Sequence, residues 1–473
     1  MASPFVEPPP AKKKKSNVTF DLTIEDYHYD SDEDIDFDEL DEAVDSDDSY
    51  DSHISTDGSE NCLDTSDSES QSILSEMDVS IPDLSGEEHN LAYTARDQTG
   101  WYNDNIINLH DHGTPKEHFA TLTDLSKEST TPGEFMKLFF NHEVCNHILE
   151  MTNKKLQFHL DEHPDISRPY FSLFVIDELY AFIGMMILFG VFRSSREPLS
   201  ELYSDDPNKG RPIFPAAMPR DRMKHLLRFL RFDDIYSRIE RVKSDKLAPI
   251  RFVFDNINST LNSAYSSNTN VTIDEHLCRY RGKCPFRQYI PSKPDKYGIK
   301  VFILADAKTF YPMNLEIYTG KCAGSRTTES LSMRLTSILK PGQVVTGDNY
   351  FTSVSLVRKL LIEKGIYYNG TIRKSRKEIP KEVNEIKGLM PFTSRFLFGN
   401  GFALIQYVPR KNKSVLMLSS VHFTKETAKD DRQKPLSITD YNKNKCGVDK
   451  LDQNIKEFRP YRAIRRWPCV VFF

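Results

Sequence analysis

Residues 271–320 carry the strand pattern from which the fold is inferred: VTIDEHLCRYRGKCPFRQYIPSKPDKYGIKVFILADAKTFYPMNLEIYTG. The first seven of these residues alternate, so Thr272, Asp274 and His276 share one face of a strand and the residues between them share the other. The closing part, YGIKVFILADAKTFYPMNLEIYTG, indicates two β-rich runs around a polar turn. The stretch therefore predicts three strands, with Asp274 leaving the sheet where loops gather.

Residues 343–365, QVVTGDNYFTSVSLVRKLLIEKG, add a strand and a helix. The short strand ends at a glycine, and Asp348 follows where the strand passes into the helix. Ser353 is a typical helix N-cap, and Gly365 is a typical C-terminal stop. We expect the helix to bury the side formed by Val354, Val357, Leu360 and Leu361.

The segments on either side differ in their hydrophobic period. SRFLFGNGFALIQYVPRKNKSVLMLSSV, residues 394–421, contains a hairpin turn at Asn400 and Gly401 and a third strand after the RKNK turn, so it predicts an inserted β-unit. Residues from about 130 to 263 carry apolar side chains every three or four positions, which predicts a helical domain. Within it, MPRDRMKHLLRFLRF is either a solvated helix face or a DNA-facing helix, with basic residues at Arg220, Arg222, Lys224, Arg228 and Arg231.

The charge of the chain is unevenly distributed. Residues 21–90 hold 26 Asp and Glu and no Lys or Arg, whereas the rest of the chain holds 43 acids against 62 bases. The acidic segment cannot bury enough apolar area to offset chain entropy, so residues 1–98 are predicted to be disordered, as a solubilising tail or as an interaction arm. The basic body suggests a polyanion partner, because Lys and Arg contacts with phosphate dominate nucleic-acid affinity.

Membrane and secreted classes are not indicated. The longest uncharged apolar run, Leu179 to Phe192, has the length of a buried core helix, and no membrane partner is expected. Seven cysteines are scattered singly without a CxxC pair, which indicates neither a disulfide framework nor a zinc finger. We expect an intracellular protein with reduced thiols.

Aspartates at separated positions could carry chemistry. Asp is disfavoured in strands, so Asp274 and Asp348 need a reason beyond propensity. Asp449 and Asp452, three residues apart in GVDKLDQ, share one face if that segment is helical. Phosphoryl transfer on DNA uses two magnesium ions about 4 Å apart, held by oxygen ligands. Each aspartate alone is more often a turn, cap or salt-bridge residue, so the spacing leaves both readings open.

Five sequence blocks bear on whether these aspartates are catalytic: TIDEHLCRYRGKCPFRQYIPSKPDKYGIK, TGDNYFTS, GTIRKSRKEIP, YNKNKCGVDKLDQ and RRWP. In this order they resemble the signature blocks of piggyBac transposases, and the resemblance runs from about residue 130 to the end. It implies an RNase H-like catalytic domain with three catalytic aspartates. On the matching positions these are Asp274, Asp348 and Asp449, and Asp452 matches the family's second acid there; together they are expected to hold two magnesium ions.

The resemblance also implies an activity. Members of the family cut each transposon 3′ end by water attack, form and reopen a hairpin, and join the ends at TTAA sites. We therefore expect a nuclear, metal-dependent DNA transposase whose partners are double-stranded DNA and a second copy of the chain. The alternative is a truncated or domesticated DNA-binding protein without transposition.

Basic residues in the same blocks are candidates for DNA contact. A solvated basic rim is the alternative, because phosphate contact needs only charge and reach. For Trp467, stacking on an unpaired base competes with a buried aromatic anchor. The candidates are Arg279, Arg281, Lys283, Arg287, Lys296, Lys300, Asn349, Arg373, Lys374, Arg376, Lys377, Arg465, Arg466 and Trp467.

The end of the chain departs from the family. Members continue past RRWP with a helical segment, a dimerisation region and a cysteine-rich zinc domain, whereas this sequence ends at Phe473. We expect those parts to be missing, no zinc to bind, and the apolar end PCVVFF to be exposed. The expected α/β organisation is an acidic tail (1–98), a helical dimerisation and DNA-binding domain (99–268), a catalytic domain in two parts (269–374 and 436–456), a β-rich insertion (375–435), and a return to the helical domain (457–473).

Overall fold

The computed structural model describes residues 91–104, 113–164, 171–195, 197–291, 293, 295–320, 327–460 and 465–473. Nearly all of the predicted acidic tail therefore lies outside the described residues. The predicted tail boundary at residue 98 is too late, because Leu91–Thr94 already form strand β1. No helix in the described part of the chain combines the length and apolar character needed to cross a bilayer.

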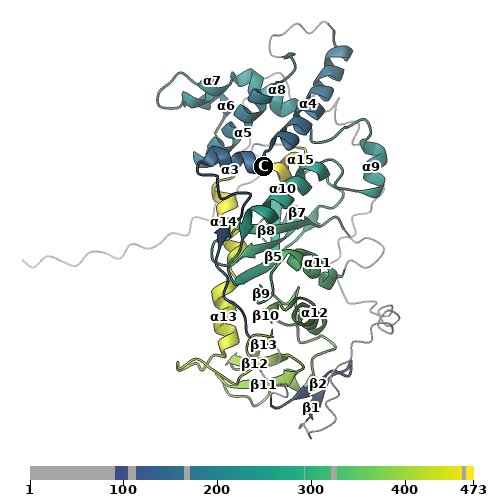
Figure 1. Cartoon of the computed structure of the whole chain (residues 1–473), viewed down its shortest axis with the longest axis vertical. Coiled ribbons are helices and arrows are strands. Elements are labelled where there is room, and N and C mark those ends of the chain that lie inside the picture. The colour runs from purple at the N-terminus through teal and green to yellow at the C-terminus, as the bar shows by residue number, and fades with distance from the viewer. Residues whose placement is uncertain are drawn as a thin grey trace, which may run out of the picture. The chain divides into compact units, whose positions relative to one another are not determined.

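Helices dominate residues 132–264, where the apolar period predicts them (Figure 1). The predicted core helix around Leu179 is confirmed as α5, and its Phe182 and Phe189 are fully buried against Val144 of α4 and Leu226 of α8. The helices are α3 (Pro132–Phe139), α4 (His142–Glu162), α5 (Ile176–Val191), α6 (Leu199–Leu202), α7 (Ile213–Ala217), α8 (Arg220–Phe229), α9 (Arg238–Ser244) and α10 (Arg251–Ala264).

The basic helix α8 does not point all its charges outward. The Arg222 guanidinium is buried and donates to the Glu178 carboxylate at 2.7 Å and to the Ser172 carbonyl at 2.7 Å. It also lies 4.0 Å from the ring centroid of Phe174. Hydrogen bonding to Arg222 lowers the pKa of Glu178. The Arg222 side chain therefore lies inside the helical core, so it is neither solvated nor facing DNA.

One large mixed sheet of eleven strands is the centre of the rest of the described chain. β5, β7 and β8 are antiparallel neighbours, β9 lies parallel to β5, and β10 lies parallel to β9. Strands β13, β12, β11, β2 and β1 extend the same sheet beyond β10. In spatial order the strands are β1 (Leu91–Thr94), β2 (Gly100–Tyr102), β11 (Ser394–Gly399), β12 (Phe402–Arg410), β13 (Lys413–Ser419), β10 (Tyr367–Thr371), β9 (Val344–Gly347), β5 (Asn270–Arg279) and β7 (Tyr297–Asp306), with β6 (Gln288–Tyr289) and β8 (Pro312–Ile317) both paired to β7.

The predicted β-insertion is present, and it continues the sheet. Its hairpin turns at Asn400 and Gly401, as predicted, and β13 pairs with β10 through Gly370 opposite Leu418. At its far edge, β2 pairs with β11, and the fully buried Trp101 donates from Nε1 to the Glu378 carbonyl at 2.9 Å. The unit predicted as a separate insertion therefore shares a backbone hydrogen-bond network with the central strands.

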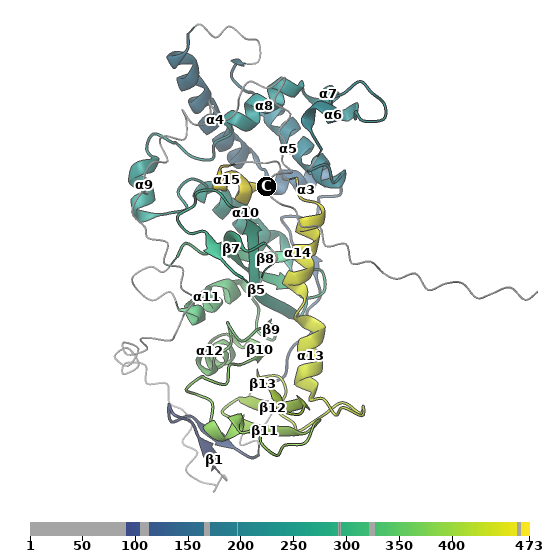
Figure 2. The ribbon, with the colours of Figure 1, turned by 180° about the vertical axis from the view of Figure 1, so that it is seen from behind.

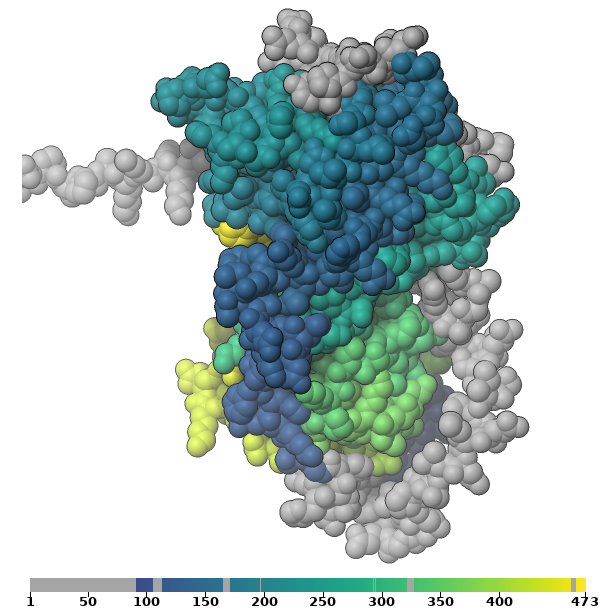
Figure 3. Space-filling view, turned by 45° about the horizontal axis from the view of Figure 1, so that its top comes forward, coloured from purple at the N-terminus to yellow at the C-terminus, as the bar shows by residue number. Residues whose placement is uncertain are grey.

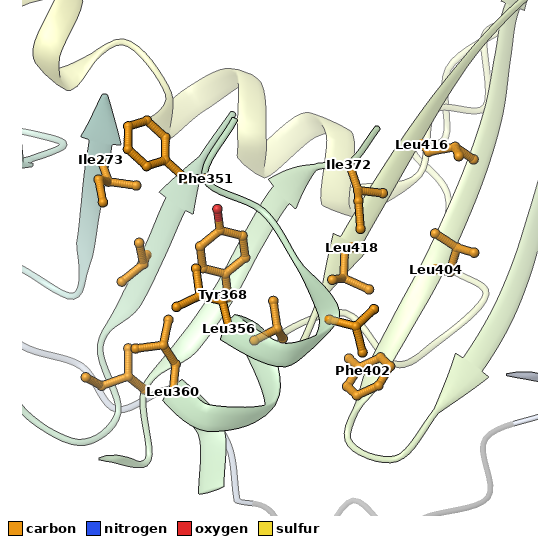
Figure 4. Close-up of a cluster of buried hydrophobic side chains, with 14 of the residues drawn as sticks. Ile273, Phe351, Leu356, Leu360, Tyr368, Ile372, Phe402, Leu404, Leu416 and Leu418 are labelled. Atoms are coloured by element: carbon orange, nitrogen blue, oxygen red, sulfur yellow. The ribbon is translucent and has the colours of Figure 1, made fainter. Parts of the chain in front are cut away.

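Helices cover both faces of the sheet, and Figures 1 and 2 show them on opposite sides. One face is covered by α11 (Thr328–Leu335), the 3₁₀ turn Thr336–Ile338 and α12 (Val354–Lys364), and the other by α13 (Leu436–Asn444) and α14 (Gly447–Glu457). Figure 4 shows Leu356 and Leu360 of α12 near Tyr368 of the sheet, and Ile273 beside Phe351, in one hydrophobic cluster.

The predicted boundaries of α12 are confirmed. Ser353 accepts a hydrogen bond from the Leu356 backbone N–H at 3.1 Å. Gly365 ends the helix with φ of 61°, a left-handed conformation that favours glycine. The expected apolar side is buried, at Val354, Val357, Leu360 and Leu361.

Residues 116–118 were expected in the helical domain, but they hydrogen-bond to residues of the sheet domain. The His118 backbone N–H donates to Thr269 Oγ1 at 2.7 Å, and that of Lys116 donates to the Gly342 carbonyl at 3.0 Å. β3 (Thr121–Leu122) pairs with β4 (Tyr265–Ser266). Figure 3 shows the blue early segments lying across the green sheet region.

The apolar end of the chain is packed, contrary to the expectation that PCVVFF is exposed. In α15 (Trp467–Phe472), Cys469 and Val470 are buried. The rings of Phe472 and Phe232 have centroids 4.6 Å apart. Because α15 contributes to both the helical core and the core between the sheet and α14, it joins the two.

Candidate active site

Two of the predicted aspartates are neighbours on adjacent parallel strands. Ile273 of β5 pairs with Gly347 of β9, so the next residue of each strand is an aspartate, Asp274 and Asp348. Adjacent strands lie about 4.8 Å apart. Asp274 is not at a strand end, because β5 continues to Arg279; it lies where the neighbouring β9 ends. The parallel pairing brings the two carboxylates together.

Both carboxylates are held in a poorly solvated place. Burial raises the pKa of Asp274 to about 7, and the charge of Asp348 adds to the shift. Burial and the charge of Glu275 likewise raise the pKa of Asp348. Each carboxylate accepts one close backbone hydrogen bond, from Glu275 N at 2.8 Å and from Tyr350 N at 2.9 Å. Neither carboxylate forms a salt bridge within the described residues, so the repulsion between the two acids is not offset by a directly paired cation.

Three cationic side chains surround this pair at a greater distance. Lys293 donates to the Glu275 carbonyl at 3.2 Å, and its charge lowers the pKa of Asp274. Lys300 lies 3.6 Å from the Glu275 carboxylate and 4.8 Å from the Tyr350 ring centroid. Arg373 donates to Asn349 Oδ1 at 3.2 Å and lowers the pKa of Asp348. Lys293 was missed in the sequence, although it lies between the predicted Arg287 and Lys296 in the same basic block.

The backbone of Asp348 is fixed from the protein interior. Its carbonyl accepts from Thr352 Oγ1 at 2.7 Å, and that hydroxyl is 2.9 Å from the hydroxyl of Tyr368. Thr352 and Tyr368 are both fully buried. A Cβ on Gly347 would overlap the Tyr368 hydroxyl and touch Ile273. Glycine before Asp348 therefore allows the strand end to pack closely against β10.

This packing gives a stability prediction. Gly347→Ala should lower the free energy of unfolding by about 1–3 kcal/mol, because the added methyl group has no space beside Tyr368 and Ile273. Gly184→Ala in α5 is the control: no atom lies within 4 Å of the added Cβ, so a change between zero and about 1 kcal/mol of stabilisation is expected. Urea unfolding of both variants checks this, and equal stability of the two would contradict the packing account.

The third predicted aspartate is carried by α14. Gly447 and Val448 of this helix are buried against β5 and β7, whereas Asp449 is exposed. Asp452 points to His276 of β5 and accepts a hydrogen bond from its Nδ1. In the described part of the chain, no group of three His, Cys, Asp or Glu residues is arranged to hold a metal ion. The structure therefore brings Asp274 and Asp348 together, and it places Asp449 and Asp452 on the adjoining helix.

The basic candidates after Asp274 fall into two groups. Arg279 lies 3.4 Å from Asp295, and Arg287 donates to the Gly282 carbonyl at 2.8 Å and lies over the Tyr297 ring. These two are tied to neighbouring protein groups. Arg287 is nevertheless exposed, as are Arg281, Lys283 and Lys296, whose side chains have no such contact among the described residues.

The basic loop after β10 lies beside Asp348. Lys374 donates to Ser414 Oγ at 2.7 Å, and burial lowers its pKa. Arg376 is half-buried, whereas Arg373, Lys377 and Asn349 are exposed. The exposed members of this loop and Asn349 can reach a ligand placed over the acid pair.

The final basic cluster connects parts of the protein. Arg466 donates to the carbonyls of Leu227 and Leu230 at the end of α8. The Trp467 ring meets Phe286 edge to face, with centroids 5.0 Å apart. These contacts match the alternative of an aromatic anchor. The Arg465 carbonyl accepts from the Tyr280 hydroxyl.

Tyr441 of α13 was not singled out from the sequence. Burial raises the pKa of Tyr441, and the charges of Asp348 and Asp274 add to the shift. Its position in YNKNKCGVDKLDQ, eight residues before Asp449, was the available signal.

Comparison with known proteins identifies the class and then the family. The family model described as Transposase IS4 matches residues 131–473, which places the chain among the transposases. A cryo-EM structure of a piggyBac transposase synaptic complex with hairpin DNA is similar, with a TM-score of 0.70 and 30% sequence identity over 75% of this chain and 74% of that one. The chain belongs to the piggyBac family of transposases.

Two human proteins show more distant similarity. PiggyBac transposable element-derived protein 3 is 25% identical over 359 residues, which is 71% of this chain and 58% of that protein. PiggyBac transposable element-derived protein 2 is 22% identical over 369 residues, which is 73% of this chain and 60% of that protein. The chain thus spans less than two thirds of the length of either relative.

Proposed function

We propose that this chain cuts and joins DNA as a divalent-metal-dependent transposase with Asp274, Asp348 and Asp449 as its catalytic acids. The observation that carries the proposal is the side-by-side placement of Asp274 and Asp348 by the parallel pairing of β5 and β9. The strand order β8-β7-β5-β9-β10, with three antiparallel strands followed by two parallel ones, supports the expected RNase H-like domain.

The residues at this place fit magnesium. Two half-buried carboxylates with raised pKa values, and without a salt-bridge partner among the described residues, form a site where a hard divalent cation would relieve repulsion. Asp274 and Asp348 would share the ions, and Asp449 would add a ligand from α14. Bound magnesium ions would supply an activated water or 3′ hydroxyl and stabilise the leaving oxyanion.

The chain's own groups then position the DNA. Arg373 and Asn349 lie beside Asp348, and Lys293 lies beside Asp274, so the scissile phosphate would meet positive charge on both sides of the acid pair. The exposed Arg281, Lys283, Lys296 and Lys377 would neutralise phosphates farther along the duplex. Such contacts fix register and carry no sequence information.

The family resemblance supplies the finer expectations. The substrate would be a transposon end flanked by TTAA, cleaved at its 3′ end and then converted to a hairpin. The similar solved structure is a synaptic complex with hairpin DNA, which supports this proposal. A nuclear location and a homodimer complete it.

Product analysis tests the proposal. The chain is incubated with magnesium and end-labelled duplexes that carry the repeats flanking its own gene next to TTAA, and the products are separated on denaturing gels. We expect a 3′ nick beside TTAA, followed by a hairpin product. A duplex with TTAA scrambled is the control and should remain uncut. Absence of both products in magnesium and in manganese would overturn the proposed activity.

A DNA-binding protein without transposition is the second candidate. Asp449 is exposed, and the described part of the chain contains no group of three His, Cys, Asp or Glu residues arranged to hold a metal ion. Both observations favour this second candidate. In that case duplex DNA should bind with a steep salt dependence while no magnesium-dependent nick appears.

A further inference from the structure

Helix α14 contacts β5 at two points. The first is Gly447, where an added Cβ would overlap Thr272 Cγ2 and lie 3.3 Å from the Asp306 carbonyl oxygen. Because no side chain fits there, the first turn of α14 lies directly on the sheet. The neighbouring Val448 is 1% exposed and packs with Ile303.

The second contact is the pair His276 and Asp452, five residues farther along the helix. The Asp452 carboxylate accepts from His276 Nδ1, and the side chains are only 9% exposed for His276 and 16% exposed for Asp452. Within the described residues, this pair is an ion pair that joins α14 to β5. An ion pair so little exposed has a defined geometry, because breaking it would leave a buried charge unpaired.

The two contacts bracket the candidate catalytic acids. Thr272, Asp274 and His276 alternate along one face of β5, so Asp274 lies between the two contact points on the strand. Asp449 lies between Gly447 and Asp452 on the helix, and it precedes Asp452 by three residues, which places both on neighbouring parts of the helix surface. A helix held at both points has a fixed rotation about its axis.

We propose that His276 and Asp452 are a positioning pair that sets the rotation of α14 and thereby directs Asp449 toward Asp274 and Asp348. The family pattern had led us to expect that Asp452 is a metal ligand. In this proposal Asp452 instead acts through His276 and does not bind the metal. The inference rests on the proposed metal site at Asp274 and Asp348. Residues that orient metal ligands in this way typically affect metal affinity by 10–100-fold when replaced.

The test measures manganese binding by the full chain, with the metal alone as the probe and electron paramagnetic resonance as the readout. His276→Ala and Asp452→Ala should each weaken manganese binding by about tenfold or more. The double variant should be no weaker than either single variant, since each breaks the same contact. Asp452→Asn keeps an acceptor for the imidazole N–H and should recover most of the affinity. Asn454→Ala, at an exposed position of the same helix, is the control and should leave binding unchanged.

Two other outcomes would contradict the proposal, and a third would contradict only the proposed function. If Asp452→Ala and Asp452→Asn are equally severe while His276→Ala is neutral, Asp452 is a metal ligand and the positioning role is wrong. If both alanine variants lower only the thermal unfolding midpoint and leave manganese affinity unchanged, the pair is structural only. A wild-type chain that binds manganese in the expected pattern but cuts no DNA would remove the proposed function and keep the positioning pair.

Discussion

Replacing Asp348 by Asn should abolish DNA strand cleavage, with a loss of at least about 10³-fold in rate. The carboxylate lies beside Asp274 at the end of β9, and its backbone is fixed by the buried Thr352 and Tyr368. Asn has the same shape and preserves this packing, but it removes the charge that a magnesium ion needs. Electrostatic stabilisation of the leaving oxygen is commonly worth several kcal/mol, so the loss is large.

DNA binding should survive this change. The phosphate contacts are proposed at Lys and Arg side chains, so the dissociation constant of Asp348→Asn for duplex DNA should stay within about tenfold of wild type, or about 1.4 kcal/mol. Asp440→Asn on α13 is the matched control, because Asp440 is paired with His422 at 2.9 Å. It should cut DNA normally. Full cleavage by Asp348→Asn would contradict the assignment of Asp348 as a catalytic acid. A large loss of DNA affinity without a loss of cleavage rate would contradict it as well.

The second large effect concerns stability without metal. Burial raises the pKa of Asp274 from its ordinary value of 3.8 to about 7, so the folded protein holds this proton more tightly than the unfolded chain does. The contribution of protonated Asp274 to the free energy of unfolding is fully present below pH 4, and it is lost as the pH rises to about 7. Between pH 5 and pH 8 the metal-free chain should lose about 2–3 kcal/mol of unfolding free energy from this group, because the loss of about 1.4 kcal/mol for each pH unit ends near the folded-state pKa of about 7.

Two comparisons isolate this effect. Asp274→Asn cannot ionise, so the difference in unfolding free energy between wild type and this variant should vary with pH in the stated direction. Contributions of other groups, such as the buried His159 with a pKa lowered to about 4, cancel in that difference. Saturating magnesium at pH 8 should stabilise the wild type and have little effect on the variant, because the ion binds the folded chain. A pH-independent difference would show that Asp274 is not held in a desolvated acid pair.

Local sequence signals predicted the elements of the sheet domain well. β5 was evident from alternation in VTIDEHL, and α12 from Ser353 and Gly365, because caps and alternation act within a few residues. The hairpin at Asn400 and Gly401 has the same origin. Such features depend on chain neighbours, so the sequence contains all the information they need.

Contacts between distant segments were not predictable in this way. The register that places Asp274 beside Asp348 joins residues 74 positions apart, and only the family resemblance linked them in the sequence. The hydrogen bonds from His276 to Asp452 and from Arg466 to the end of α8 give Asp452 and Arg466 partners within the protein that the sequence did not indicate. Charged residues were assigned to ligands because a sequence does not show which charges are satisfied inside the protein.

Anomalous diffraction from crystals of the full chain soaked in manganese would show whether Asp274 and Asp348 share a divalent cation. We predict an anomalous peak between the two carboxylates, about 2.0–2.2 Å from an oxygen of each, and no such peak in crystals of Asp348→Asn. An empty map at this place under saturating manganese, or a peak held by other residues, would contradict the account.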